Sequence, residues 1–254
     1  MNKMSQRHHE IKLAYLEHRM SKMAAGFFGK KNGRAVVYVT RDPDNPEVSA
    51  KHKRCYFTSS KNGQHWDKII REYILVRSEY EMLLKDWKSK YISPPRKISF
   101  PLKKRRKDLI DREFFENAVP NQNKREVRNP IEHNGQVFRS KNEILSCEVL
   151  EAMGYEYKTE VNLKGNDWME FYPDLMFYVP ELDKVFVFEI DGALDVIVYD
   201  GHSFSRTSNY LNCGFVEGKD LICYRISDSK AISIEQIENL IRAAIESSLD
   251  DIIN

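Results

Sequence analysis

The segment 171–192, FYPDLMFYVPELDKVFVFEIDG, holds two apolar runs joined by a short polar turn, and carboxylates stand at the ends of both runs. Asp174 follows Pro173 at the head of the first run, and Glu189 and Asp191 close the second. Short runs of aromatic and β-branched residues are typical of buried strands. A carboxylate on a buried strand costs free energy unless it is paired or binds a cation. The segment therefore predicts a hairpin that carries a functional group of acids.

The geometry of a hairpin would bring these acids together. Side chains alternate between the two faces of a strand, so Glu189 and Asp191 share one face. An antiparallel partner would place Asp174 beside them at one edge of the sheet. Three carboxylates this close repel one another unless a hard divalent cation lies among them. Oxygen ligands suit Mg²⁺ or Mn²⁺, which can polarise a phosphodiester and lower the pKa of a bound water.

From residue 136 onward the pattern predicts a compact α/β unit. Ser140 and Glu143 have the spacing of a capping box at the start of a helix, and Gly154 is its natural end. The expected order is α-β-β-β-α-β-α. Helices are expected over 140–153, 199–214 and 233–249, and strands over 155–163, 169–179, 184–192 and 220–227.

The preceding residues predict a separate basic α+β region and a linker. Helical periodicity is expected over 5–25 and 62–91, and strands over 34–40 and 53–60, while GFFGKKNGR at 26–34 is interpreted as a turn. Five prolines and few apolar stretches mark the following segment as a linker, with one short helical piece around 108–118. The predicted domains are the basic region 1–92, the linker 93–135 and the α/β domain 136–254.

Formal charge is divided sharply along the chain. Residues 1–140 carry 31 Lys and Arg against 16 Asp and Glu, a net charge of +15, whereas residues 141–254 carry 9 against 22, a net charge of −13. A basic half suits a polyanion, and an acidic half suits cations. The alternative is that the two halves dock on each other and neutralise their charge.

The basic residues cluster beside aromatic ones, as in proteins that bind phosphates and stack on bases. Tyr38, Tyr56 and Phe57 are these aromatic neighbours, and no helix-turn-helix or zinc-finger spacing is present. The residues expected to bind nucleic acid, with DNA as the favoured partner, are Lys30, Lys31, Arg34, Lys51, Lys53, Arg54, Lys103, Lys104, Arg105, Arg106 and Lys107.

The order α-β-β-β-α-β, with Pro-Asp in the second strand and Glu near the end of the third, resembles the PD-(D/E)XK nuclease superfamily. The matching segments are RSKNEIL, YPDLMFYV, VFVFEIDG and SRTSNYLNCGF, within about 136–230. The resemblance implies a restriction-endonuclease-like core with a mixed sheet and a Mg²⁺- or Mn²⁺-dependent endonuclease activity. It also implies that Asp174 and Glu189 are catalytic metal ligands and that Glu143 completes the metal shell, while Asp191 is a further candidate ligand.

The sequence departs from the superfamily at its lysine, because Asp191 stands two residues after Glu189 where that lysine is expected. The lysine stabilises the charged transition state or positions the attacking water, so a cation is expected from elsewhere. Arg206 on the following helix is the first candidate, since the spacing Arg206, Tyr210, Gly214 is similar to that of bacterial proteins with the same variation. Lys158 on the first strand is the second. If neither acts, the chain is a non-catalytic nucleic-acid-binding or assembly protein on a degenerate nuclease fold.

Simpler explanations stay open for several of these residues. Glu143 can serve only as a helix-capping glutamate, and Asp191 with Gly192 can form an ordinary turn. The run KKRRK at 103–107 can be a solvated charge cluster, and His202 is more often a cap or surface residue than a member of a site.

The sequence also predicts the setting of the protein. No apolar run approaches the roughly 20 residues that span a bilayer, and the N-terminal stretch has no secretory apolar core. The four cysteines show no C-x-x-C spacing, so we expect reduced thiols in a cytoplasmic protein. The long helix over 64–90 could also pair with a second copy as a homodimer.

Replacing the five cations at 103–107 with alanine should flatten the salt dependence of DNA binding, because fewer counterions are released. On duplex DNA, the slope of log K against log salt should fall by roughly 0.9 for each phosphate that the variant no longer neutralises. Fluorescence anisotropy of a labelled duplex at several salt concentrations measures this slope. An unchanged slope would identify KKRRK as a solvated charge run.

Overall fold

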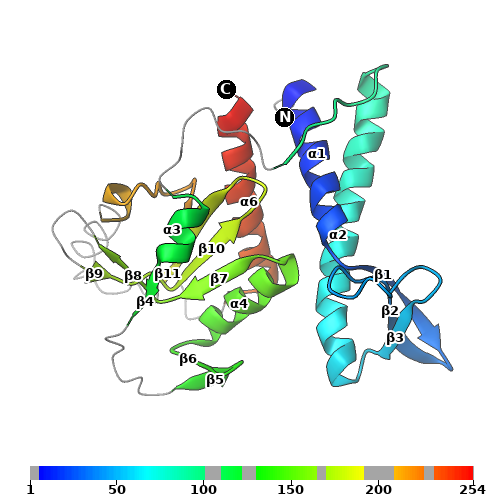
Figure 1. Ribbon diagram of the computed structural model, residues 1–254, viewed down its shortest axis with the longest axis horizontal. Coiled ribbons are helices and arrows are strands. Elements are labelled where there is room, and N and C mark those ends of the chain that lie inside the picture. Colours follow the sequence, from blue (N-terminus) through cyan, green and yellow to red (C-terminus); the bar gives the residue numbers. More distant parts are fainter. Residues whose placement is uncertain are drawn as a thin grey trace. The chain divides into compact units, whose positions relative to one another are not determined.

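The computed structural model describes residues 6–100, 110–121, 130–164, 170–191, 209–225 and 232–253. The chain divides into two compact units. The first unit is Met1–Phe100 with Ala152–Gly154, and the second is Pro101–Glu151 with Tyr155–Asn254. Each unit is described by itself, and Figure 1 labels the elements of both.

The first unit contains two long helices and a small antiparallel sheet. Helix α2 packs against α1 and also covers the sheet, whose strand order is β1-β2-β3. The elements are α1 (Gln6–Lys22), β1 (Ala25–Lys31), β2 (Arg34–Arg41), β3 (Arg54–Phe57) and α2 (Lys61–Lys90). Both expected helices and the two expected strands are therefore confirmed.

Strand β1 replaces the turn that was expected over 26–34. The turn consists only of Asn32 and Gly33, whose φ values of 52° and 75° suit the tight connection of a hairpin. The sequence pattern did not predict this strand because glycine has a low strand propensity. Gly26 is required here by close backbone approach: a Cβ atom at Gly26 would lie 2.0 Å from the carbonyl oxygen of Tyr38.

A buried ion pair joins the two long helices. Arg19 on α1 donates from Nη2 to Oε1 of Glu72 on α2 at 3.1 Å, and both side chains are almost fully buried. Farther along the same two helices, the ring of His9 is also buried, with Nε2 at 2.9 Å from the carbonyl oxygen of Leu83. Buried charges need such partners because water cannot solvate them.

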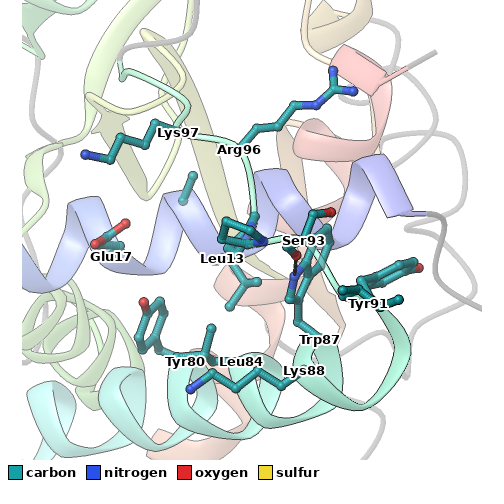
Figure 2. A pocket seen from close by; sticks show the side chains of 14 residues that line it. Leu13, Glu17, Tyr80, Leu84, Trp87, Lys88, Tyr91, Ser93, Arg96 and Lys97 are labelled. Atoms are coloured by element: carbon teal, nitrogen blue, oxygen red, sulfur yellow. Dashed lines mark hydrogen bonds between the residues drawn. The ribbon is translucent and has the colours of Figure 1, made fainter.

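The chain beyond α2 folds back along the two helices. Trp87 donates from Nε1 to the carbonyl oxygen of Ser93 at 2.8 Å, which anchors this return. A groove of about 450 Å³ lies along it, and Figure 2 shows Tyr80, Trp87 and Tyr91 among its lining side chains. The first residues of the expected linker thus pack on the first unit.

The second unit is built on a mixed four-stranded sheet with the order β12-β11-β10-β7. Strand β10 pairs antiparallel with β7 and with β11, and β12 lies parallel to β11. Residues 209–212, between β11 and β12, are helical. The elements are α4 (Lys141–Met153), β7 (Glu156–Thr159), β10 (Leu175–Val179), β11 (Lys184–Asp191), β12 (Leu221–Arg225) and α6 (Ile234–Ile253). In the described residues, the expected α/β order is therefore observed.

Two of the expected strands are each divided into two. The first breaks at Glu160, whose φ of 45° is left-handed, and the second breaks around Pro173, which has no N–H for a ladder. The separated pieces join a second small sheet with the order β4-β8-β9. These strands are β4 (Val119–Pro120), β8 (Val161–Lys164) and β9 (Glu170–Phe171).

Part of the expected linker also belongs to the second unit. Helix α3 (Arg112–Asn117) confirms the expected short helical piece, and it packs on β10 and β11. Its N-cap is Asp111, which accepts from the amide of Phe114 at 3.2 Å, and Phe115 is buried in the core. Two further strands, β5 (Ile131–His133) and β6 (Gln136–Phe138), form a hairpin.

None of the helices within the described ranges has both the length and the hydropathy that crossing a membrane requires.

Glu72→Ala should lower the free energy of unfolding of the first unit by about 3–5 kcal/mol, because it removes the carboxylate that pairs with the buried Arg19 guanidinium. Glu81→Ala is the matched control on the same helix, since its ion pair with Arg77 is exposed, and it should cost less than about 0.5 kcal/mol. Urea unfolding followed by circular dichroism at 222 nm measures both. Equal losses for the two variants would contradict a structural role for the buried pair.

Candidate carboxylate site

Asp174 directly precedes β10, and Glu189 lies on its antiparallel partner β11. Leu175 lies opposite Phe188, and Met176 lies opposite Val187. Asp174 lies at a bend directly before β10, and its side chain bonds the amide of Ile190, the residue that follows Glu189 on β11. The structure therefore places the Asp174 carboxylate beside the end of β11 that carries Glu189.

Asp174 occupies the point at which the sheet divides. Its Oδ2 accepts a hydrogen bond from the amide of Ile190 at 2.8 Å, so the side chain continues the β10–β11 ladder where β10 has ended. Its carbonyl oxygen accepts from the amide of the left-handed Glu160 at 3.4 Å. A carboxylate in this position is held in place by the backbone of a neighbouring strand.

Glu189 faces a buried tyrosine. Its side chain is 4% exposed, and its Oε1 accepts a short hydrogen bond from the hydroxyl of Tyr210. Tyr210 is itself buried and packs edge-to-face on Phe171 with ring centroids 4.8 Å apart. The helical turn that carries Tyr210 ends at Gly214, whose φ is 93°.

Tyr210 was not among the predicted site residues. The signal that could have found it is the spacing Arg206, Tyr210, Gly214, in which only the arginine was assigned a role.

Glu143 forms the predicted capping box at the start of α4. Ser140 donates from Oγ to Oε1 of Glu143 at 3.0 Å, and the amide of Glu143 donates back to Ser140 Oγ at 3.2 Å. Burial, and next the negative charge of Asp174, raise the pKa of Glu143 above its usual range. Its hydrogen bonds and the charge of Arg139 act in the opposite direction but more weakly. Glu143 is thus both a helix cap and an electrostatic neighbour of Asp174.

Arg139 is a second residue that the sequence pattern did not identify. Its Nη2 lies 2.5 Å from Oε1 of Glu160, and its amide donates to Oε2 of Glu143 at 3.3 Å. Because Glu160 also bonds the backbone of Asp174, this arginine belongs to the immediate surroundings of the carboxylates. The only signal in the sequence is its place directly before the capping serine.

Lys158 has a different role from the one expected. Its ammonium donates to the carbonyl oxygens of Phe115, Glu116 and Ala118 at 2.7, 3.0 and 3.0 Å. These bonds use all three of its hydrogens and cap the C-terminal end of α3. The structure thus engages Lys158 with α3, and the sequence had not predicted this contact.

Arg206 and His202 lie outside the described residues, and so do Lys103, Lys104, Arg105, Arg106 and Lys107. The backbone of Asp191 pairs with Arg225 in the β11–β12 ladder, but its side chain lies outside the part of the chain that the structure describes.

The carboxylates fit a metal ion in their chemistry, but the described residues do not complete a ligand set. Within these ranges, no group of three or more His, Cys, Asp or Glu side chains lies close enough to hold an ion. Asp174 and Glu189 instead accept hydrogen bonds from Ile190 and Tyr210. What is in place is the Asp174 carboxylate beside the end of β11 that carries Glu189, with Glu143 close enough to feel the charge of Asp174.

No protein-family model, curated protein or solved structure matches this chain.

Burial is the larger cause of the raised pKa of Glu143 and stays in place, but Asp174→Asn removes the negative charge that adds to it, so this pKa should fall part of the way toward its usual range. Because the raised pKa belongs to the folded state, ionised Glu143 costs stability at neutral pH, and this cost disappears as the pH falls through that pKa. An NMR titration of the ¹³C-labelled side-chain carboxyl of Glu143 measures the shift directly. Asp183→Asn is the control: Asp183 has a φ of 46°, which asparagine tolerates, and it should leave the titration unchanged. A Glu143 titration insensitive to Asp174→Asn would show that the two carboxylates are not coupled.

Proposed function

We propose that this protein is a metal-dependent nuclease that hydrolyses phosphodiester bonds, with DNA as the favoured substrate. The observation that carries the proposal is the position of Asp174, whose carboxylate bonds the amide of Ile190, the residue directly after Glu189 on β11. The order of elements around this pair supports a restriction-endonuclease-like core, since three antiparallel strands are followed by one that lies parallel to β11.

In this proposal, Asp174 and Glu189 would hold Mg²⁺ or Mn²⁺, with Glu143 and Asp191 as further ligands. Such an ion would polarise the scissile phosphodiester and lower the pKa of a water nucleophile. Tyr210 would orient Glu189 through its hydroxyl, and the Ile190 amide would orient Asp174. These bonds pre-position the oxygen donors without consuming all of their acceptor capacity, since each ionised carboxylate has about four lone-pair sites.

Our first candidate for the cation that stabilises the charged transition state is Arg206. It precedes Tyr210 by four residues, the spacing of neighbours on one helix face. A guanidinium is permanently charged and offers a fork of donors to phosphate oxygens. Arg139 is the alternative, because it already lies beside Glu143 and Glu160. Lys158 ranks below both, since its ammonium is engaged by α3.

A second candidate function is a non-catalytic nucleic-acid-binding or assembly protein on the same fold. The observation that favours it is that, among the described side chains, no group of three potential ligands lies close enough for an ion, while Glu189 is bonded to a buried tyrosine. The substitution of Asp191 for the superfamily's lysine points the same way.

The purified chain should cleave nucleic acid in the presence of Mg²⁺ or Mn²⁺, and Asp174→Asn should abolish cleavage. Arg206→Ala should slow cleavage by roughly a hundred- to a thousandfold, because it removes a preorganised donor to the transition state. Linear, supercoiled and single-stranded DNA, and RNA, are compared as substrates. Arg139→Ala is assayed in parallel. If either variant cuts as fast as the wild type, the arginine replaced in it does not supply the cation that stabilises the transition state.

Metal binding is measured separately, so that the two candidate functions can be told apart. Mn²⁺ in excess over its dissociation constant should raise the melting temperature of the wild type and not that of Asp174→Asn, since a ligand that binds the folded state stabilises it. A wild type that neither cuts nor responds to Mn²⁺ would replace the nuclease proposal with the binding-protein alternative.

A further inference from the structure

The sheet of the first unit has one face under α2 and one face with exposed aromatic rings. On the α2 side, Phe28 packs with Arg71, and Tyr56 stacks on Trp66. The opposite side carries Phe27 and Phe57, which are 43% and 38% exposed. The register places Phe27 opposite Tyr38, and Phe57 opposite Val36, so these rings share one face. Exposed apolar residues mark an interaction site when they form a contiguous patch, so the arrangement of these rings decides what the face can bind.

The rings on this surface are arranged as a platform. Phe27 and Tyr38 stack with their centroids 4.9 Å apart and their planes inclined by 23°. Tyr38 also lies over Gly29, because a Cβ atom at that position would be 3.0 Å from the Tyr38 ring. The absence of a side chain at Gly29 therefore leaves room for the Tyr38 ring.

Positive charge borders the same rings. The Lys53 ammonium lies 4.9 Å from the Tyr38 ring centroid and 5.4 Å from that of Phe27. Lys31 and Arg34 are opposite each other at the hairpin end, and the register assigns both to the ring-bearing face. By the same alternation, Lys30 and Arg54 fall on the α2 side. We call the surface formed by Phe27, Lys31, Arg34, Tyr38, Lys53 and Phe57 the aromatic face.

The combination of exposed rings and neighbouring cations favours single-stranded over duplex nucleic acid. A duplex offers phosphates, but its bases are stacked on each other and present no free ring surface. A single strand offers both phosphates and unstacked bases, and base–aromatic stacking with a cationic border is how sequence-tolerant single-strand binding proteins work. Lys53 is a flexible point charge, so its ammonium can leave the rings for a phosphate when a base arrives.

We infer that the aromatic face binds single-stranded nucleic acid, with bases stacked on Phe27, Tyr38 and Phe57 and phosphates held by Lys31, Arg34 and Lys53. The inference extends the proposed function by giving the first unit a substrate class. It rests on the geometry of that unit alone and does not require the carboxylate pair to be catalytic.

Binding is tested by fluorescence anisotropy with labelled (dT)₂₀, (U)₂₀ and a 20-base-pair duplex. The full-length chain is used with Asp174→Asn and EDTA, so that binding is measured without cleavage and a failure of the nuclease proposal does not affect the result. We expect tighter binding to a single strand than to the duplex, and the two oligonucleotides decide between DNA and RNA. Combined Phe27→Ala and Phe57→Ala substitutions should weaken single-strand binding by about tenfold or more, with little effect on the duplex.

Two further variants separate stacking from folding and charge. Phe27→Trp keeps a ring at the same position, so it should retain binding, and its added tryptophan emission should be quenched by (dT)₂₀. Lys53→Ala should flatten the salt slope on a single strand by roughly 0.7. Met82→Ala, at a residue that is 65% exposed on α2, and Lys85→Ala, at an exposed lysine of the same helix, are the matched controls and should behave like the wild type.

Several outcomes would overturn the inference. One is single-strand affinity that the double phenylalanine variant leaves unchanged, and another is Phe27→Trp emission that saturating oligonucleotide does not alter. An equal loss of duplex and single-strand binding in the double variant would show that the rings support the fold or a general phosphate surface and do not stack on bases. A wild type that binds neither single-stranded oligonucleotide would also exclude the proposal.

Discussion

The hydrogen bond from the Ile190 amide to the Asp174 carboxylate extends the contact between β11 and the chain before β10 at the point where the mixed sheet divides. Pro173 cannot donate to a ladder, and Glu160 turns the facing strand out of the sheet. A side-chain oxygen therefore takes over as an acceptor for the backbone of β11. The same bond holds the carboxylate at β11 beside the position of Glu189, so the break in the sheet and the position of the acid are linked.

The carboxylates of Asp174, Glu189 and Glu143 have different surroundings. Asp174 is stabilised by a backbone amide and Glu189 by a buried tyrosine hydroxyl, whereas the pKa of Glu143 is raised by burial and by the charge of Asp174. Arg139 supplies positive charge through Glu160 and Glu143. In the proposed nuclease, a bound cation would relieve the repulsion between Asp174 and Glu143, which raises the pKa of Glu143 in addition to burial. The nuclease proposal depends on this electrostatic argument, and the Mn²⁺ experiment tests it.

Local patterns predicted most of the elements and missed those in which glycine or proline conceals a strand. The capping box at Ser140 and Glu143 predicted the start of α4 correctly, because side-chain and backbone partners lie within one turn. Strand β1 was missed because Gly26 and Gly29 have low strand propensity, although the close approach of Tyr38 requires them. Arg139 and Tyr210 were missed as site residues because their partners lie 21 positions away in sequence, Glu160 for the one and Glu189 for the other.

The sequence by itself determined the alternation that places Glu189 among buried strand residues, the order of elements in the second unit and the uneven charge of the two halves. Only the tertiary structure decided that Asp174 bonds the amide of Ile190, that Tyr210 reaches Glu189 and that Lys158 caps α3. It also decided which of the basic residues share a face with Phe27 and Phe57. The physical reason is that periodicity specifies which side of its own element a residue faces, whereas strand register and the packing of distant segments specify what lies there.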